Sequence, residues 1–305
     1  MKRWVRVTLQ LVVIGLVLYG LYRYGAKNWA EIRRAPEAVE IHAGPLLLAA
    51  GIILGTYAIL IVAWQAVVRG WGERLPFVAA ARIWCLSNLA RYIPGRVWQI
   101  AGMAGMAQKA GVSPWAAAGS AIVVQLLNIA TGTLVTFAFA PSFDSPWLVV
   151  LGGVATAAVA AALAWPAGAA WLSRLLKRLT GKDVELQAVR PGPLLLSAAI
   201  TAVAWMLYGL ALYFSVRGLT GRDVDLRTAV GVFTGAYVAG LINIFTPSGL
   251  GTREGILVTW LSGPLGPAAA TVVTAGSRLL MTATELAAAL ITLPLTTPRA
   301  DGRNA

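Results

Sequence analysis

Charged side chains occur inside the apolar stretches of this 305-residue sequence, where such groups are expensive and therefore rare. The arginines among them are suited to bind an anion, above all a phosphate, because a guanidinium can form two parallel hydrogen bonds to it. The carboxylates could equally hold these arginines in buried salt bridges that only support the fold, and both interpretations stay open. The charged residues concerned are Arg82, Arg91, Arg96, Arg253, Glu254, Arg278 and Glu285.

Two motifs that break helices lie beside these charges. The first reads N-L-A-R-Y-I-P-G-R-V-W over residues 88–98, and the second reads N-I-F-T-P-S-G-L-G-T-R-E over residues 243–254. Each proline ends a helix, and the helix that follows begins with free N–H groups and the positive end of its dipole. Glycines next to the prolines let a ligand approach the backbone closely. The combination predicts two corners that bind an anion.

We therefore expect one binding site, formed by the two motifs and by polar residues of neighbouring helices. Arg278 and Glu285 lie seven residues apart, hence on one helical face, and we expect them to face Arg253 and Glu254. The candidate residues are Asn88, Arg91, Pro94, Gly95, Arg96, Gln125, Asn243, Pro247, Gly249, Gly251, Arg253, Glu254, Arg278 and Glu285.

No catalytic residue, metal site or cofactor is expected. His42 is the single histidine and Cys85 the single cysteine, so neither a metal cluster nor a Ser-His-Asp triad has the partners it needs. The acids are few and far apart, which argues against an enzyme.

The composition predicts an all-α polytopic membrane protein, with residues 1–305 forming one integral membrane domain. Hydrophobic residues make up 58% of the chain, charged residues only 12%, and the mean hydropathy is +0.72. The net charge is +13, but the basic residues mostly flank apolar runs. They are therefore expected to orient the chain and to contact anionic lipids, and nucleic acid is not expected as a partner.

Apolar runs long enough to cross a bilayer mark the expected spans. A first run, ending at about Tyr22, could be a signal peptide or a first span, and the internal repeat described next favours a span. Residues 171–179 could form an amphipathic helix at the membrane surface or only the charged end of the preceding span. The other expected spans cover residues 45–68, 114–140, 147–170, 193–216 and 267–293.

An internal repeat organises the chain. Gly44-Pro45 recurs as Gly192-Pro193, 148 residues later, and the Val-Arg-Gly sequence of residues 68–70 recurs at 216–218. After a five-residue insertion the offset becomes 153. This offset places Pro94 on Pro247, Pro114 on Pro267 and Gln125 on Arg278.

The repeat predicts two halves of like design. Repeat 1 covers about residues 5–140 with a broken or re-entrant helical hairpin at 77–109, and repeat 2 covers about 147–295 with a hairpin at 228–262. Each half has three transmembrane helices besides its hairpin. Three crossings are an odd number, so the second half is expected to be inverted relative to the first. The bias of lysine and arginine between the two sides places both termini in the cytoplasm.

The stretches N-x-x-R-Y-I-P-G-R-V-W at 88–98 and T-P-S-G-L-G-T-R-E at 246–254 resemble those of the lysylphosphatidylglycerol synthase transmembrane-region family, also called flippase-like domains. The resemblance covers roughly residues 5–295. It implies a protein of the bacterial inner membrane that handles lipids with anionic headgroups, and an envelope-lipid biosynthetic enzyme is a possible partner. The soluble aminoacyl-transferase domain of the full synthases is not found in this sequence, so lysyl transfer is not expected.

Three functions follow as hypotheses. The first is a lipid translocator that moves an anionic phospholipid or lipid-linked intermediate between leaflets, with the headgroup bound between the two hairpins. The second is an intramembrane enzyme that acts on a lipid phosphate or a lipid-linked sugar. The third is a scaffold for an envelope complex that transports nothing itself.

Overall fold

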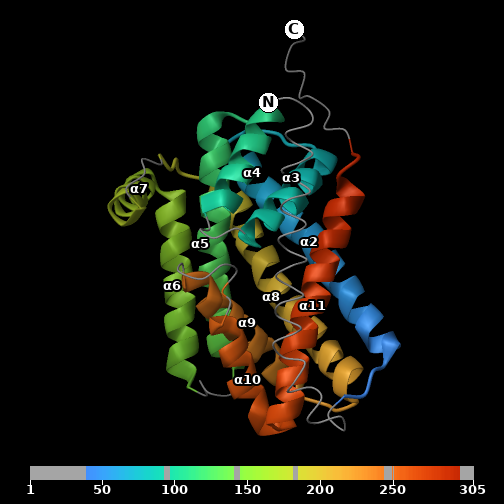
Figure 1. Ribbon diagram of the computed structural model, residues 1–305. Coiled ribbons are helices and arrows are strands. Elements are labelled where there is room, and N and C mark those ends of the chain that lie inside the picture. Colours follow the sequence, from blue (N-terminus) through green and yellow to red (C-terminus); the bar gives the residue numbers. More distant parts are fainter. Residues whose placement is uncertain are drawn as a thin grey trace.

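The computed structural model describes residues 39–92, 97–140, 145–180, 185–243, 249 and 251–295. In these ranges ten α-helices and one 3-10 helix make up the fold (Figure 1), and no strand occurs beyond an isolated bridge between Glu40 and Thr220. The predicted all-helical fold is therefore confirmed. The helices are α2 (Ala43–Gly70), α3 (Phe77–Leu89), η2 (Ala90–Tyr92), α4 (Val97–Lys109), α5 (Pro114–Phe139), α6 (Pro146–Ala164), α7 (Pro166–Thr180), α8 (Pro191–Thr220), α9 (Leu226–Ile242), α10 (Thr252–Leu265) and α11 (Pro267–Thr292). The predicted first span, ending at about Tyr22, lies outside the described residues.

Proline begins many of these helices, because its fixed φ suits the first turn and its missing N–H would have no partner there. Helices α5, α6, α7, α8 and α11 start in this way, at Pro114, Pro146, Pro166, Pro191 and Pro267.

Four of the described helices, α2, α5, α6 and α8, are long and apolar enough to cross a membrane. This supports a polytopic membrane protein. Helix α11, which the sequence predicts as the last span, is as long as α5, with 26 residues. It is less apolar because it carries Arg278 and Glu285, so its crossing stays a prediction.

Helices α2 and α8, which the repeat places at equivalent positions, lie side by side and run in opposite directions. The N–H of His42 donates to the carbonyl of Gly218, and the N–H of Arg190 donates to the carbonyl of Gly70. A Cβ on Gly70 would lie 2.4 Å from Val189, and one on Gly218 would lie 2.7 Å from Leu46. The repeated Val-Arg-Gly sequence therefore supplies the glycine that lets each helix end against the start of the other.

Helix α5 joins helices of both halves, because it contacts α2, α8 and α9. The indole of Trp64 in α2 donates to Ser120 Oγ, and the indole of Trp205 in α8 donates to the carbonyl of Asn128. Where α9 approaches the end of α5, a Cβ on Gly231 would lie 2.3 Å from the Ala140 backbone. Small residues thus allow the close helix crossings that are common in membrane bundles.

The two broken segments are α3 to α4 with η2 between them, and α9 to α10. They lie in different parts of the bundle. Helices α3 and α4 lie toward the top of Figure 1, whereas α9 and α10 lie toward its lower end. Helix α3 packs against α11 and helix α9 packs against α5. The first helix of each broken segment therefore packs on the last long helix of the other half. Residues 93–96 and 244–248, which contain Pro94 and Pro247, lie outside the described residues.

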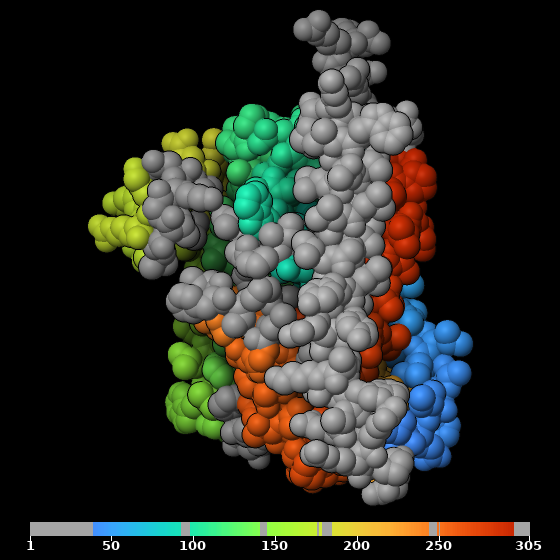
Figure 2. Space-filling view, viewed as in Figure 1, coloured from blue at the N-terminus to red at the C-terminus, as the bar shows by residue number. Residues whose placement is uncertain are grey.

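Helix α7 is a separate helix, so the preceding span is shorter than predicted. The span α6 ends at Ala164, the chain turns at Trp165, and α7 begins at Pro166. The turn is tight, since a Cβ on Gly168 would lie 2.5 Å from the carbonyl oxygen of Ala162. Helix α7 stands out from the rest of the molecule in Figure 2, and its Trp171 is 54% exposed. This arrangement favours the amphipathic helix over the extended span.

Candidate functional site

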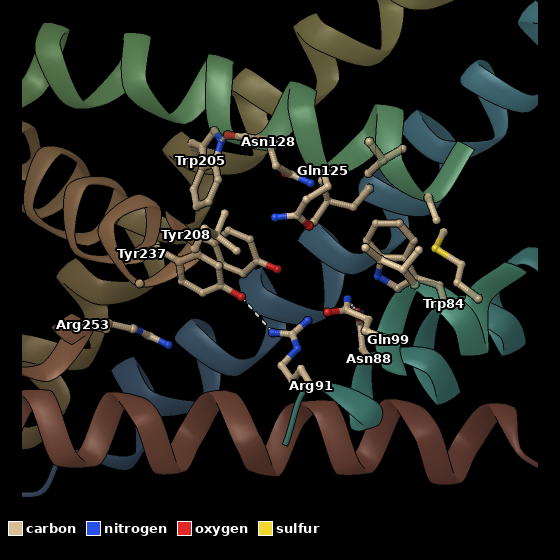
Figure 3. A pocket seen from close by; sticks show the side chains of 17 residues that line it. Trp84, Asn88, Arg91, Gln99, Gln125, Asn128, Trp205, Tyr208, Tyr237 and Arg253 are labelled. Carbon is tan, nitrogen blue, oxygen red and sulfur yellow. Dashed lines mark hydrogen bonds between the residues drawn. The ribbon is translucent and has the colours of Figure 1, made fainter. Parts of the chain in front are cut away.

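A cavity of about 90 Å³ lies where both halves of the chain meet. That volume holds roughly several water molecules. Its walls come from α2, α3, α4 and α5 of the first half and from α8, α9 and α10 of the second, with Arg91 of η2 reaching in between them (Figure 3). The lining includes Trp84, Asn88, Arg91, Gln99, Gln125, Asn128, Trp205, Tyr208, Tyr237 and Arg253.

Arg91 is held in the cavity wall by two side chains of the second half. Its Nη1 donates to Glu285 Oε1 at 2.8 Å and to the hydroxyl of Tyr237 at 2.8 Å. Glu285 uses its other oxygen, Oε2, to accept from the hydroxyl of Tyr92, also at 2.8 Å. Tyr92 is close enough to Thr282 Oγ1, at 3.0 Å, to hydrogen-bond there as well. Both carboxylate oxygens of Glu285 are thus in use.

The second broken segment is also held by an ion pair with α11. Arg278 of α11 forms an ion pair with Glu254 Oε1. Glu254 is the third residue of α10, and its Oε2 accepts from the backbone N–H of Gly251, 2.7 Å away. A carboxylate in this position satisfies a free N–H and suits the positive end of the helix dipole. Helix α11 therefore holds both broken segments through ion pairs.

Arg253 is a buried cation with a different set of neighbours. Its Cζ lies 5.2 Å from the ring centre of Phe233 and 5.0 Å from that of Tyr237. Its Nη2 lies 2.9 Å from the sulfur of Met281, a weak acceptor. The residue is 6% exposed, and its Nε has no hydrogen-bond partner in the described part of the chain. Among the described residues no carboxylate forms an ion pair with Arg253, although the residue lines the cavity.

Amide side chains form another part of the wall. Gln99 Nε2 donates to Asn88 Oδ1 at 2.6 Å, which joins α4 to α3 across the first break. Gln125 and Asn128 extend from α5 toward the cavity, across from Arg91 (Figure 3). Trp205 and Tyr208 of α8 complete this wall with aromatic surface.

The predicted site residues divide into three groups. Asn88, Arg91, Gln125 and Arg253 surround the cavity. The other described ones are Asn243, Gly249, Gly251, Glu254, Arg278 and Glu285, and none of these is in the cavity wall. The candidates Pro94, Gly95, Arg96 and Pro247 lie outside the described residues.

The residues outside the wall have structural contacts of their own. Asn243 Nδ2 donates to Thr252 Oγ1 at 2.6 Å, across the second break. Gly249 has a φ of +68°, and a Cβ there would lie 2.8 Å from Gly240. Gly249 therefore packs against the backbone of α9. Arg278 and Glu254 form an ion pair, as the interpretation of these charges as supports of the fold predicts.

One expected pairing differs from the structure. Arg278 does face Glu254, but Glu285 binds Arg91 of the first half instead of facing Arg253. Residues seven apart share a helical face, yet each is free to meet a different neighbouring segment.

Several wall residues were not among the predicted ones, namely Trp84, Gln99, Asn128, Trp205, Tyr208 and Tyr237. Asn128 could have been predicted from the sequence, because it lies three positions after Gln125 and hence on the same face of α5. The aromatic residues could not, since tryptophan and tyrosine are ordinary components of apolar helices. No group of three or more His, Cys, Asp or Glu side chains that could hold a metal ion occurs in the described part of the chain.

Comparison with known proteins identifies the family. No curated protein gives a match to this chain. The model of a membrane-domain family, described as the lysylphosphatidylglycerol synthase TM region, matches residues 7–289. That match includes both broken segments and every residue of the cavity wall. The chain therefore belongs to the lysylphosphatidylglycerol synthase transmembrane-region family.

Proposed function

We propose that the protein is a membrane lipid translocator that binds an anionic headgroup in the central cavity, between the two broken helices. The observation that carries this proposal is Arg253, a buried cation in the cavity wall that pairs with no described carboxylate. Burial of an unpaired charge costs several kcal/mol, so such a residue is expected to have a counter-ion in the working protein. A phosphate in the cavity would supply it.

The second cation of the wall supports the same interpretation. Arg91 approaches the cavity from the first half and Arg253 from the second, so an anion bound between them contacts both halves. Arg91 is already neutralised by Glu285, which leaves Arg253 as the charge that attracts the ligand. We propose that Arg91 contributes hydrogen-bond donors and Arg253 the net positive charge.

The arrangement of the helices suits alternating access. We propose that the two halves form inverted repeats and that each broken segment is a re-entrant hairpin. The opposite directions of α2 and α8, and the packing of α3 on α11 and α9 on α5, support this. Rocking of one half against the other would then expose the headgroup to one side of the membrane at a time. We place the protein in the bacterial inner membrane, with both termini in the cytoplasm.

Leaflet-resolved transport of a fluorescent phosphatidylglycerol in proteoliposomes tests the proposal. The variant is Arg253→Gln, which removes the charge and keeps hydrogen-bonding atoms. We expect its initial rate to fall by about tenfold or more, the equivalent of losing roughly 1.4 kcal/mol of headgroup binding. Arg69→Gln, at an exposed arginine near the end of α2, is the matched control and should keep the wild-type rate. An unchanged rate for Arg253→Gln would exclude this site.

A further inference from the structure

The charge balance of the cavity wall defines the ligand more narrowly, and this inference rests on the proposed function. Aspartate and glutamate are absent from the wall as far as the structure describes it. Arg91 is compensated by Glu285, 2.8 Å away, whereas Arg253 has no such partner among the described residues. The lining groups therefore leave one uncompensated positive charge. A phosphodiester, which carries one negative charge, matches it.

The carboxylates nearest to the wall are already engaged. Glu285 binds Arg91 through Oε1 and Tyr92 through Oε2. Glu254 binds Arg278 through Oε1 and the N–H of Gly251 through Oε2. An ammonium group in the cavity would meet the positive charge of Arg253 and no free carboxylate among the described residues. Like charges brought together in a desolvated site cost several kcal/mol.

Neutral hydrogen-bonding groups occupy the wall across from Arg91. The side chains of Gln125 and Asn128 are half-buried, extend toward the cavity in Figure 3, and form no hydrogen bond with another described residue. An amide offers both a donor and an acceptor, as a hydroxyl group does. The aromatic rings of Trp205 and Tyr208 add apolar surface beside them, which suits the C–H faces of a polyol or a sugar.

We propose that the cavity selects a phosphodiester with one negative charge and an uncharged headgroup rich in hydroxyls, such as glycerol or a sugar, and disfavours headgroups that carry an ammonium. Arg253 and Arg91 hold the phosphate, while Gln125 and Asn128 hydrogen-bond the hydroxyls. An aminoacylated lipid, including the lysyl lipid in the family's name, is then a poor ligand for this chain.

Binding of short-chain lipids to the purified full chain tests the selectivity. The probes are dihexanoyl phosphatidylglycerol, its lysyl ester, and glycerophosphoglycerol as the headgroup without acyl chains. We expect phosphatidylglycerol to bind at least about tenfold more tightly than the lysyl ester, a difference of roughly 1.4 kcal/mol. Binding of glycerophosphoglycerol would support recognition of the headgroup by itself, because this probe carries the same phosphodiester without acyl chains.

The variant Gln125→Glu provides a second test. It adds to the cavity wall a carboxylate of nearly the same shape, which can pair with the ammonium groups of the lysyl ester. The preference for phosphatidylglycerol over the lysyl ester should therefore fall by about tenfold or more. Gln108→Glu, at an exposed glutamine of α4, is the control and should keep the wild-type preference. Equal affinities of the wild type for the two lipids, both lost in Arg253→Gln, would overturn this inference and leave the translocator proposal intact. Binding of either lipid that does not depend on Arg253 would overturn both.

Discussion

Arg91 and Glu285 form an ion pair between the two halves of the chain, with Nη1 and Oε1 2.8 Å apart, although 194 positions separate the residues. Arg91 lies in η2, directly before the first break, and Glu285 lies in α11. The side chain of Glu285 is only 4% exposed. The pair therefore fixes the guanidinium in the cavity wall and ties the first broken segment to the second half.

Breaking this pair is expected to destabilise the protein strongly. Either Arg91→Gln or Glu285→Gln leaves a buried charge without its partner, which costs about 3–5 kcal/mol of the free energy of unfolding. The double variant should recover much of that loss, because no unpaired charge remains. Unfolding in mixed micelles, analysed as a double-mutant cycle, measures the coupling.

The exposed pair of Arg217 and Asp223 is the control for that cycle. Its atoms Nε and Oδ1 lie 2.6 Å apart, but the side chains are 45% and 66% exposed. An exposed pair contributes about 0–1 kcal/mol, so Arg217→Gln and Asp223→Asn should have little effect. Equal losses for the buried and the exposed pairs would contradict the role given to Glu285.

Arg253 should behave in the opposite way. Because its charge is buried without a described carboxylate partner, Arg253→Gln removes an unfavourable burial and should leave the thermal unfolding temperature unchanged or higher. Transport should nevertheless fall. A lower unfolding temperature for Arg253→Gln, of the size seen for Arg91→Gln, would indicate that Arg253 supports the fold and has no special role in binding.

The helix crossing at Gly231 gives a prediction about stability alone. The Cβ of Gly231→Ala would lie 2.3 Å from the backbone of Ala140, and a backbone has little room to move. We expect a loss of about 1–3 kcal/mol in the free energy of unfolding, as for other overpacked sites. At Gly51 no described atom lies within 4 Å of a new Cβ. Gly51→Ala should therefore be neutral or slightly stabilising, since alanine favours a helix by about 0.5–1 kcal/mol.

The charge of the cavity can be measured with thiol reagents. Cys85, the single cysteine, is buried, and Cys85→Ala provides a background without reactive thiols. In that background Asn128→Cys should react several times faster with a negatively charged methanethiosulfonate than with a positively charged one, because Arg253 raises the local concentration of anions. Adding Arg253→Gln should remove the preference. A cysteine at exposed position 108 should show none in either case.

Much of the fold could be predicted from the sequence, for identifiable reasons. Pro114 and Pro267 begin both the predicted spans and the observed helices, whereas α8 begins at Pro191, two residues before the predicted start, and apolar length separates the spans from the connections. The break between α6 and α7 was missed because Trp165 continues the apolar run. The start of α7 at Pro166 was the local signal, since a proline following an apolar run favours a new first turn.

Only part of the site could be predicted from the sequence. Arg91, Arg253 and Gln125 were predictable because polar groups in apolar helices are expensive and need a reason. Their partners were not, since the sequence leaves open which acid meets which arginine. Glu285 shares a helical face with Arg278, and only the packing of α3 on α11 brings it to Arg91. The aromatic wall depends in the same way on how α8 and α9 cross α5.

The ion pairs of α11 bear on how the protein is assembled in the membrane. A helix with an arginine and a glutamate near its middle inserts poorly by itself, at a cost of roughly 2.5–3.5 kcal/mol for each charge. Among the described residues Arg278 forms an ion pair with Glu254 of α10, and Glu285 forms one with Arg91 of η2, so we expect α11 to become stable after both broken segments have formed. Helix α11 follows both in the chain, and we therefore expect it to close the bundle during biogenesis. A chain with either broken segment misfolded is then expected to leave α11 uninserted and open to quality-control proteases.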